Sequence, residues 1–402
     1  MQYTAPGVYV NEVPSGARPI VGVGTSIAGF IGLVTDDVEM PDQPGQFELD
    51  TFGVPDKDRP IPYTVAPVNE PQLITNWTEF KSKFGDIQVG NKTLAHALYG
   101  FFNNGGTRCW VSRLNTTLTA ANVGDALTKF EAIDEIALVA VPGALDENGV
   151  VDKDILGAVI DHCENMGDRF AILDGNPEVT GAWTPDNITE IRDSDYAALY
   201  FPWINVYDPL TNGLIEQPPS GHIAGIYARV DNQRGVHKAP ANEVIRGASN
   251  VKYRLSRAHQ EGLNPDGINV IRAFNGNITV WGARTLGGDD NGEWKYINVR
   301  RLFLFLRESI DEGTQWVVFE PNTPDLWGKI VRNITAFLTT VWRGGALFGS
   351  TPQEAFYVKC DAETNPPEVR DLGQVVTEIG VAVVKPAEFV IFNITQWAGP
   401  GA

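Results

Sequence analysis

The 402-residue sequence predicts an α/β protein, α+β overall, with a parallel sheet as its body and extended β-arms at both ends. The sheet follows from residues 136–174, where an apolar segment, 136–141, a helical period over 154–166 and a second apolar segment, 170–174, form a β-α-β pattern. Apolar strands without alternation are typical of parallel sheets covered on both faces. The N-terminal arm follows from a β-prone end that has nothing local to pair with.

The N-terminal arm is the first predicted element. Pro6, Gly7 and Pro14 bracket a β-prone heptad, residues 7–13, and a polar turn separates it from the next apolar run. Because an isolated strand exposes unpaired backbone groups, such an arm either docks on its own domain or completes a sheet in a neighbouring chain.

The body follows in order along the chain. Residues 27–34 form a short apolar run, and the Pro- and Asp-rich stretch 36–71 predicts an irregular or protruding segment. The remaining patterns predict helices over 76–84 and 94–102 and strands over 109–113 and 196–207. We therefore expect residues 26–262 to form one α/β body.

The C-terminal part predicts a helix over 297–310, a strand over 316–319 and an amphipathic helix that begins after Thr323 and ends at Gly344. Pro324 suits the first turn of that second helix, and glycine suits its end. Its apolar face comprises Leu326, Trp327, Ile330, Val331, Ile334, Phe337, Leu338, Val341 and Trp342. Its opposite side carries Lys329, Arg332 and Arg343, which form either a solvated helix back or a contact surface.

Composition excludes several classes of protein. The formal charge of −19 argues against a nucleic-acid partner, which would require a basic surface. No apolar run approaches the roughly 20 residues that span a membrane, and the N-terminus does not resemble a signal peptide, so we expect no direct membrane insertion. The cysteines, Cys109, Cys163 and Cys360, lack metal-like spacing, and their odd number favours buried, reduced thiols.

Five segments in the same order along the chain resemble contractile tail sheath proteins, the family found in myovirus tails, R-type pyocins and extracellular contractile injection systems. These segments are 3–26, 218–241, 263–286, 296–322 and 384–395. Residues 36–215 resemble the family less clearly, which implies variable, outward-facing insertions there.

The resemblance implies four parts: an N-terminal linker arm (1–25), an outer, subtilisin-like α/β body (26–262), a sheath core domain facing the tube (263–384) and a C-terminal β-arm (385–402). It implies a structural protomer that stacks as rings around an inner tube in a metastable extended state and contracts to drive the tube through a cell envelope. The implied partners are further copies of the chain, the inner tube protein, baseplate and terminator or cap proteins, and paralogous sheath subunits. It implies assembly in the bacterial cytoplasm and requires no cofactor.

The resemblance also suggests site residues. The tube-facing helix would present Lys329, Arg332 and Arg343. The arm strands that add to neighbouring subunits would include Val8, Tyr9, Val10, Glu12, Phe389, Ile391, Asn393 and Thr395. We interpret Arg272, Arg284, Arg300 and Arg301 as partners for Asp and Glu in the core or at subunit borders, because arginine suits partly buried ion pairs better than lysine. The alternative is an anion site.

Two alternatives remain. A subtilisin-like fold raises the possibility of a silent or active hydrolase, and the sequence around Ser26 resembles that of a subtilase nucleophile. The chain order argues against it, because every histidine follows Ser26, whereas subtilases place the histidine before the serine. We therefore predict that the protein is not an enzyme and has no catalytic, cofactor-binding or metal site. The other alternative is a non-contractile structural or ligand-binding α/β protein.

Overall fold

The computed structural model describes residues 19–392, which divide into two compact units. The larger unit comprises Val23–Phe305 and the C-terminal segment from Val383, and the smaller comprises Leu306–Ala382 with residues 19–22. The division at Phe305 lies within helix α8 (Ile297–Thr314). The boundary expected after residue 262 is not the boundary between these units, because two later strands extend the sheet of the larger unit.

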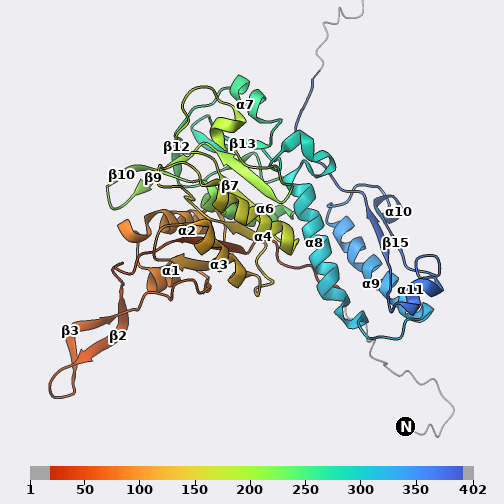
Figure 1. The fold of residues 1–402 in the computed structure, drawn as a ribbon, viewed down its shortest axis with the longest axis horizontal. Coiled ribbons are helices and arrows are strands. Elements are labelled where there is room, and N and C mark those ends of the chain that lie inside the picture. The colour runs from red at the N-terminus through yellow and green to blue at the C-terminus, as the bar shows by residue number, and fades with distance from the viewer. Residues whose placement is uncertain (1–18, 393–402) are drawn as a thin grey trace, which may run out of the picture. The chain divides into compact units, whose positions relative to one another are not determined.

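A nine-stranded sheet forms the larger unit (Figure 1). In spatial order its strands are β11 (Glu243–Val244), β14 (Asn277–Val280), β13 (Ile268–Phe274), β8 (Ala197–Phe201), β7 (Phe170–Asp174), β6 (Leu138–Ala140), β1 (Ala28–Leu33), β5 (Cys109–Leu114) and β4 (Gln72–Ile74). The six strands from β13 to β5 run parallel, whereas β4, β14 and β11 pair antiparallel at the edges. The structure is therefore a mixed α/β fold with a large, mainly parallel sheet.

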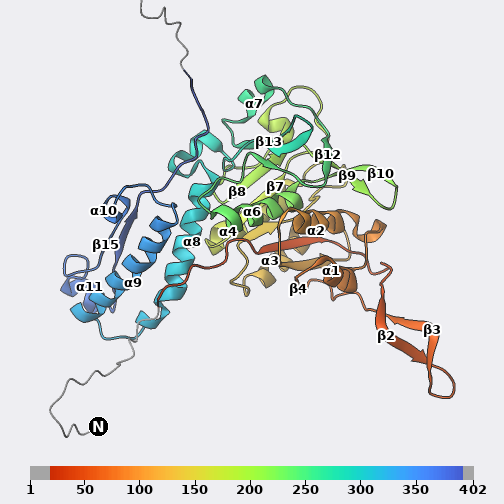
Figure 2. The same ribbon diagram turned by 180° about the vertical axis from the view of Figure 1, so that it is seen from behind.

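Helices cover both faces of this sheet (Figures 1 and 2). The helices of the larger unit are α1 (Trp77–Phe84), α2 (Lys92–Asn104), α3 (Ala120–Phe130), α4 (Lys153–Met166), α5 (Pro185–Ile188), α6 (Ser220–Arg234) and α7 (Arg257–Leu263), with 3₁₀ turns at Val89–Asn91 and Gly288–Trp294. Helices α2 and α6 share one apolar cluster with Phe170 and Ile172 of β7, and α3 and α4 share the other with Ala171 and Leu173. Successive β7 residues thus pack into opposite layers, as expected for a strand buried on both faces.

The predicted β-α-β unit is confirmed, with β6 and β7 parallel and α4 between them in the chain. Helix α4 begins at the N-cap Asp152, whose carboxylate accepts the backbone N–H groups of Asp154 and Ile155. It ends at Gly167, whose φ of 68° falls in the left-handed region that favours glycine.

Two predicted segments contain more regular structure than expected. The stretch 36–71 holds a hairpin of β2 (Asp42–Leu49) and β3 (Pro55–Pro62), which stands away from the sheet of its unit in Figure 1. The single strand expected over 196–207 is wrong: it divides into β8 and β9 (Ile204–Asp208). Pro202 lies between them and lacks the N–H needed to continue a ladder. Strand β9 instead forms a second sheet with β10 (Gly213–Gln217) and β12 (Ala248–Val251).

The smaller unit contains the end of α8, helices α9 (Pro324–Arg343), α10 (Pro352–Ala355) and α11 (Pro367–Asp371), and a two-stranded sheet of β15 (Phe356–Lys359) and β16 (Glu378–Val381). The helix predicted over 297–310 is confirmed by α8. The strand predicted over 316–319 is wrong, because a 3₁₀ turn occupies Gln315–Val317. There the N–H groups of Val318 and Glu320 bond to carbonyls three residues earlier, which folds the backbone into turns.

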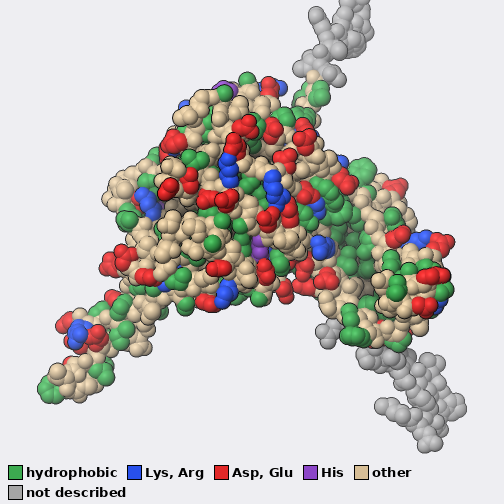
Figure 3. Space-filling view, in the orientation of Figure 1, with side chains coloured by type: hydrophobic (Ala, Val, Ile, Leu, Met, Phe, Trp, Pro, Cys, Tyr) green, Lys and Arg blue, Asp and Glu red, His purple; other side chains and the backbone are tan. Residues whose placement is uncertain are grey.

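Acidic side chains are scattered over the face of the larger unit that Figure 3 displays. Cys109, Cys163 and Cys360 are free and buried, which confirms that prediction. Within residues 19–392, no helix has the length and apolar composition to cross a membrane.

Candidate functional site: chain-end anchors and an exposed helix face

Helix α9 is the amphipathic helix that the sequence predicts. It begins after the N-cap Thr323 with Pro324 in its first turn, and Gly344 is its C-cap. Seven of the nine predicted apolar positions are buried, and Val331 and Trp342 are half-buried. The helix therefore packs through one face and leaves the other exposed.

The exposed face of α9 carries Lys329, Arg332 and Arg343, as predicted. One acid accompanies them: Asp325 Oδ2 lies 2.8 Å from Lys329 Nζ. The hydrogen bond and the charge of Lys329 lower the pKa of Asp325. With three cations and one acid, this face is net positive at neutral pH.

The N-terminal side of the described chain is held by an apolar contact in the smaller unit. Ile20 is 8% exposed, although its neighbour Val21 is 77% exposed. A Cβ atom added to Gly313 of α8 would lie 2.6 Å from Ile20 Cγ1, closer than real side chains approach. Glycine at 313 thus leaves the space that Ile20 fills. The sequence predicts this helix only to residue 310, whereas α8 continues to Thr314, so Gly313 gave no signal of the contact.

A buried ion pair holds the next residues to the larger unit. Arg301 and Asp231 are bidentate, at 3.0 Å between Nη1 and Oδ1 and 2.6 Å between Nη2 and Oδ2. Arg301 Nη2 also donates to the Thr25 carbonyl oxygen at 2.8 Å, and the Thr25 hydroxyl donates to Asp231 at 2.7 Å. Residue 25 is thereby joined to α6 and to the start of α8.

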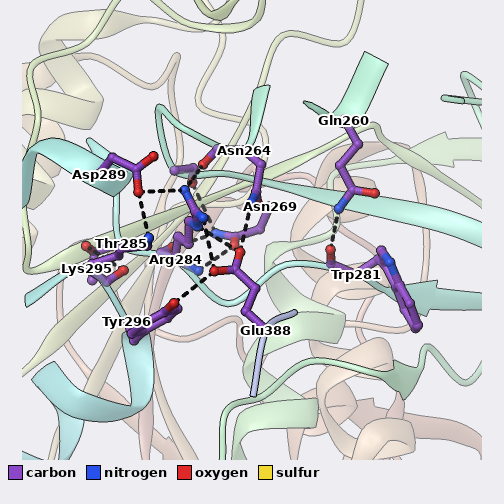
Figure 4. Close-up of polar contacts among 11 residues, drawn as sticks. Gln260, Asn264, Asn269, Trp281, Arg284, Thr285, Asp289, Lys295, Tyr296 and Glu388 are labelled. Atoms are coloured by element: carbon purple, nitrogen blue, oxygen red, sulfur yellow. Dashed lines mark hydrogen bonds and ion pairs between the residues drawn. The ribbon is translucent and has the colours of Figure 1, made fainter. Parts of the chain in front are cut away.

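The C-terminal side is held by a network centred on Glu388 (Figure 4). Arg284 donates from Nε to Oε1 at 2.8 Å and from Nη2 to Oε2 at 3.0 Å. The Tyr296 hydroxyl donates to Oε2 at 2.9 Å, and Asn264 Nδ2 donates to Oε1 at 2.8 Å. We call these four residues the Glu388 clamp. Each of the two carboxylate oxygens accepts two hydrogen bonds, so the orientation of the carboxylate is fixed.

Further contacts hold Arg284 in place. Its Nη1 donates to the Asn264 carbonyl oxygen at 2.9 Å and to Asp289 Oδ1 at 3.1 Å, and Lys295 Nζ lies 2.6 Å from the same Asp289 oxygen (Figure 4). Burial opposes the charge on Arg284 and on Glu388, but the hydrogen bonds and charges around each group together outweigh it. The pKa of Arg284 is therefore raised and the pKa of Glu388 lowered. Burial, with the adjacent Glu388 carboxylate, raises the pKa of Tyr296 to about 12.

Four large apolar residues follow the clamp directly. Phe389, Val390, Ile391 and Phe392 are 69%, 67%, 80% and 82% exposed. The structure assigns no strand to them within the larger unit. Of the predicted arm residues, Val8, Tyr9, Val10, Glu12, Asn393 and Thr395 lie outside the described residues.

Three of the four arginines singled out in the sequence pair with acids. Arg284 pairs with Glu388, Arg301 with Asp231 and Arg300 with Asp195. Among the described residues, Arg272 pairs with no acid: its Nη1 bonds to the amide oxygen of Gln260 at 3.2 Å, and its guanidinium stacks on Phe274 in a cation–π contact. An acidic partner for Arg272 at a subunit border stays a prediction.

The hydrolase alternative depends on serine, histidine and aspartate side chains converging. The Ser220 hydroxyl donates to Asp174 Oδ2 at 2.6 Å, and its backbone N–H donates to Oδ1 at 2.8 Å. Burial raises the pKa of Asp174 to about 7. His96, in contrast, lies 3.3 Å from Asp208. The Ser220 hydroxyl therefore bonds to an aspartate rather than to a histidine, and this arrangement does not resemble a Ser-His-Asp triad.

Two protein families match successive parts of the chain. Residues 116–286 match the phage tail sheath protein central domain, and residues 289–396 match the phage tail sheath C-terminal domain. The tail sheath protein of Vibrio phage KVP40 is 30% identical over 180 residues, which are 44% of this chain and 26% of that protein. The tail sheath protein of Escherichia phage P2 is 22% identical over 375 residues, 86% of this chain and 85% of that one. The chain spans between about a quarter and about half of the length of the first curated relatives that it matches.

Solved structures match over nearly the whole chain. The helical sheath of the anti-feeding prophage in its contracted state is 30% identical, with a TM-score of 0.74 over 98% of this chain and 99% of that one. The sheath complex of an extracellular contractile injection system, PVC, also in its contracted state, is 28% identical, with a TM-score of 0.75 over 99% of both chains. The chain belongs to the phage tail sheath protein family.

Proposed function

We propose that this chain is the sheath protomer of a contractile injection particle. It stacks as rings around an inner tube in a metastable extended state, and contraction drives the tube through a target envelope. The observation that carries the proposal is the similarity over 99% of the chain to a sheath from such a particle. The matches to both sheath domains support it.

The arms, residues 1–25 and 385–402, add strands to the sheets of neighbouring protomers. The sheet of β15 and β16 supports this role, because among the described residues each strand pairs only with the other and retains an open edge. A two-stranded sheet is marginal by itself, and additional strands stabilise it. The exposed apolar side chains of 389–392 are suited to such pairing.

The positive face of α9 contacts the inner tube through Lys329, Arg332 and Arg343. The larger unit, whose parallel sheet with helices on both faces is compatible with a subtilisin-like body, lies on the outside. The net charge of −19 over the whole chain keeps finished particles apart by repulsion. The further partners are the baseplate, the terminator or cap proteins and paralogous sheath subunits.

The protein acts as a structural element rather than an enzyme, and it assembles in the bacterial cytoplasm before release. The energy for contraction resides in the assembly, as a difference in contact free energy between two packings of the same protomers.

Co-expression of the chain with the tube and baseplate proteins from its own gene cluster tests the proposal. Electron microscopy is expected to show long sheathed particles, together with shorter, wider sheaths after mild denaturant treatment. Naked tubes beside a soluble, unassembled chain would contradict it.

A further inference from the structure

We propose that the Glu388 clamp fixes the root of the C-terminal arm on the larger unit, so that the arm bends only from Phe389 onward. Arg284, Tyr296 and Asn264 are then positioning residues for the link between protomers. This inference rests on the proposed function, because it assigns the fixed end of an arm that the proposed function uses.

The site that receives Glu388 is built from separate segments of the larger unit. The donors to Glu388 come from three separate segments: Asn264 follows α7, Arg284 follows β14, and Tyr296 precedes α8. The Arg284 side chain is 4% exposed, so the receiving guanidinium is buried. A bidentate pair between planar groups restricts both the distance and the angle of approach. The backbone at 388 is therefore held in direction as well as position.

The segment before the clamp is also held on the larger unit. Asn298 Nδ2 donates to the Val384 carbonyl oxygen at 3.3 Å and to the His237 carbonyl oxygen at 2.8 Å. Residues 384 and 388 are thus both tied to the larger unit. Loss of the Glu388 contact would free four residues and lengthen the arm by about 13 Å.

Side-chain exposure increases sharply directly after the clamp. The Glu388 side chain is 20% exposed, whereas the four apolar residues after it are 67% to 82% exposed. Successive residues of an extended chain point to opposite sides, so this stretch presents apolar side chains on both sides. The clamp therefore separates a fixed segment from one that the described part of the larger unit leaves uncovered.

The mechanical consequence concerns contraction. A strand that is docked on a neighbour but has a slack root lets its own body rotate without moving the neighbour. With a fixed root, the rotation of one protomer is passed to the next. The clamp would thus matter more for contraction than for assembly.

The test compares Glu388→Gln with a matched control, Glu164→Gln. Glu164 also accepts hydrogen bonds from both terminal nitrogens of an arginine, Arg192, at 2.9 Å each, and from the Ser194 hydroxyl at 2.6 Å. It lies in α4, away from the C-terminal segment in the chain. A third variant inserts two glycines between Glu388 and Phe389, which leaves the clamp intact and slackens the arm after it.

In the unassembled protomer, Glu388→Gln is expected to speed hydrogen–deuterium exchange of residues 384–388 about tenfold, the effect of losing one charge-assisted bond. Glu164→Gln leaves exchange there unchanged. In particles assembled with the tube, Glu388→Gln and the glycine insertion both form extended sheaths that fail to contract after mild denaturant. Combining the two changes adds nothing, because each alone already lets the body rotate without moving the neighbour.

Unchanged exchange at 384–388, wild-type contraction of the Glu388→Gln sheaths, or a larger defect in the combined variant would each overturn the inference. If the wild-type chain forms no sheath, the proposed function fails instead. The exchange experiment still decides whether the clamp holds the segment.

Discussion

Ile20 and Glu388 lie near the two ends of the described chain and are held by different kinds of contact. Ile20 fills a space left by Gly313 in the smaller unit, and Glu388 accepts four hydrogen bonds in the larger unit. An apolar contact has no preferred direction and depends mainly on the area buried. A bidentate ion pair weakens when its angle changes.

This difference indicates that the two end segments of the described chain are held differently. The segment around Ile20 can shift slightly while Ile20 remains buried, although Thr25 is fixed by its hydrogen bonds to Arg301 and Asp231. The C-terminal segment cannot turn without losing hydrogen bonds. Under the proposed function, the C-terminal link would transmit rotation and the chain before Thr25 would accommodate it.

The largest effect is expected at the buried pair beside the N-terminal segment. Asp231→Ala leaves Arg301, 3% exposed, without its carboxylate partner. Removing one member of a buried pair costs about 3–5 kcal/mol, and urea unfolding of the protomer measures it. Asp325→Ala removes an exposed partner of Lys329 and should leave the urea midpoint unchanged. Equal midpoints for the two variants would contradict the assigned role of Asp231.

A smaller effect is expected at Gly313. Gly313→Ala improves helix propensity but places a methyl group against Ile20, so we expect a net loss of about 1–3 kcal/mol. The control is Gly157→Ala in α4, where nothing lies within 4 Å of an added Cβ, and a gain of about 0.5–1 kcal/mol is expected. If Gly313→Ala stabilises the protein like the control, Ile20 is not anchored there.

Acid should separate the two anchors. Because the folded-state pKa of Glu388 is lowered, the stability that its charge contributes is fully present above its ordinary pKa of 4.5 and is lost as pH falls through the folded-state pKa. The difference in unfolding free energy between wild type and Glu388→Gln should therefore shrink toward zero as the pH falls below 4.5. The difference for Ile20→Ala should persist over the same range. Unfolding titrations at several pH values measure both, and parallel curves would mean that the Glu388 charge contributes nothing.

The smallest effect on the protomer is expected from charge reversal on α9. Changing Lys329, Arg332 and Arg343 to Glu alters an exposed face and should barely move the unfolding midpoint. Extended assembly on the tube should nevertheless fail, because the face would change sign. Full-length sheathed particles from this variant, seen by electron microscopy, would exclude a tube contact through these residues.

Elements with strong local patterns could be predicted from the sequence. The β-α-β unit and helix α9 follow from apolar periodicity and from caps such as Thr323 and Gly344, which act within a few residues. The hairpin in 36–71 was predicted only as a protrusion, although Asp50 organises its turn by accepting the N–H groups of Phe52 and Val54. Its several prolines obscured the strand pattern.

The anchors could not be predicted, because their partners are distant in the chain. Arg284 and Glu388 lie 104 residues apart, and Thr25 and Asp231 lie 206 apart. Composition indicated that the arginines would pair with acids but not which acids. The contact of Arg272 with Phe274 could not be predicted either, since only the fold places that ring beneath the guanidinium.

Truncation after Glu388 tests most directly whether the arm links protomers without belonging to the core of its own chain. The chain ending at Glu388 retains the clamp and lacks the exposed residues that follow. Sedimentation velocity combined with thermal unfolding should show a monomer with the wild-type midpoint that forms no sheath on the tube. Normal sheaths from this variant, or a protomer that no longer folds, would contradict the account.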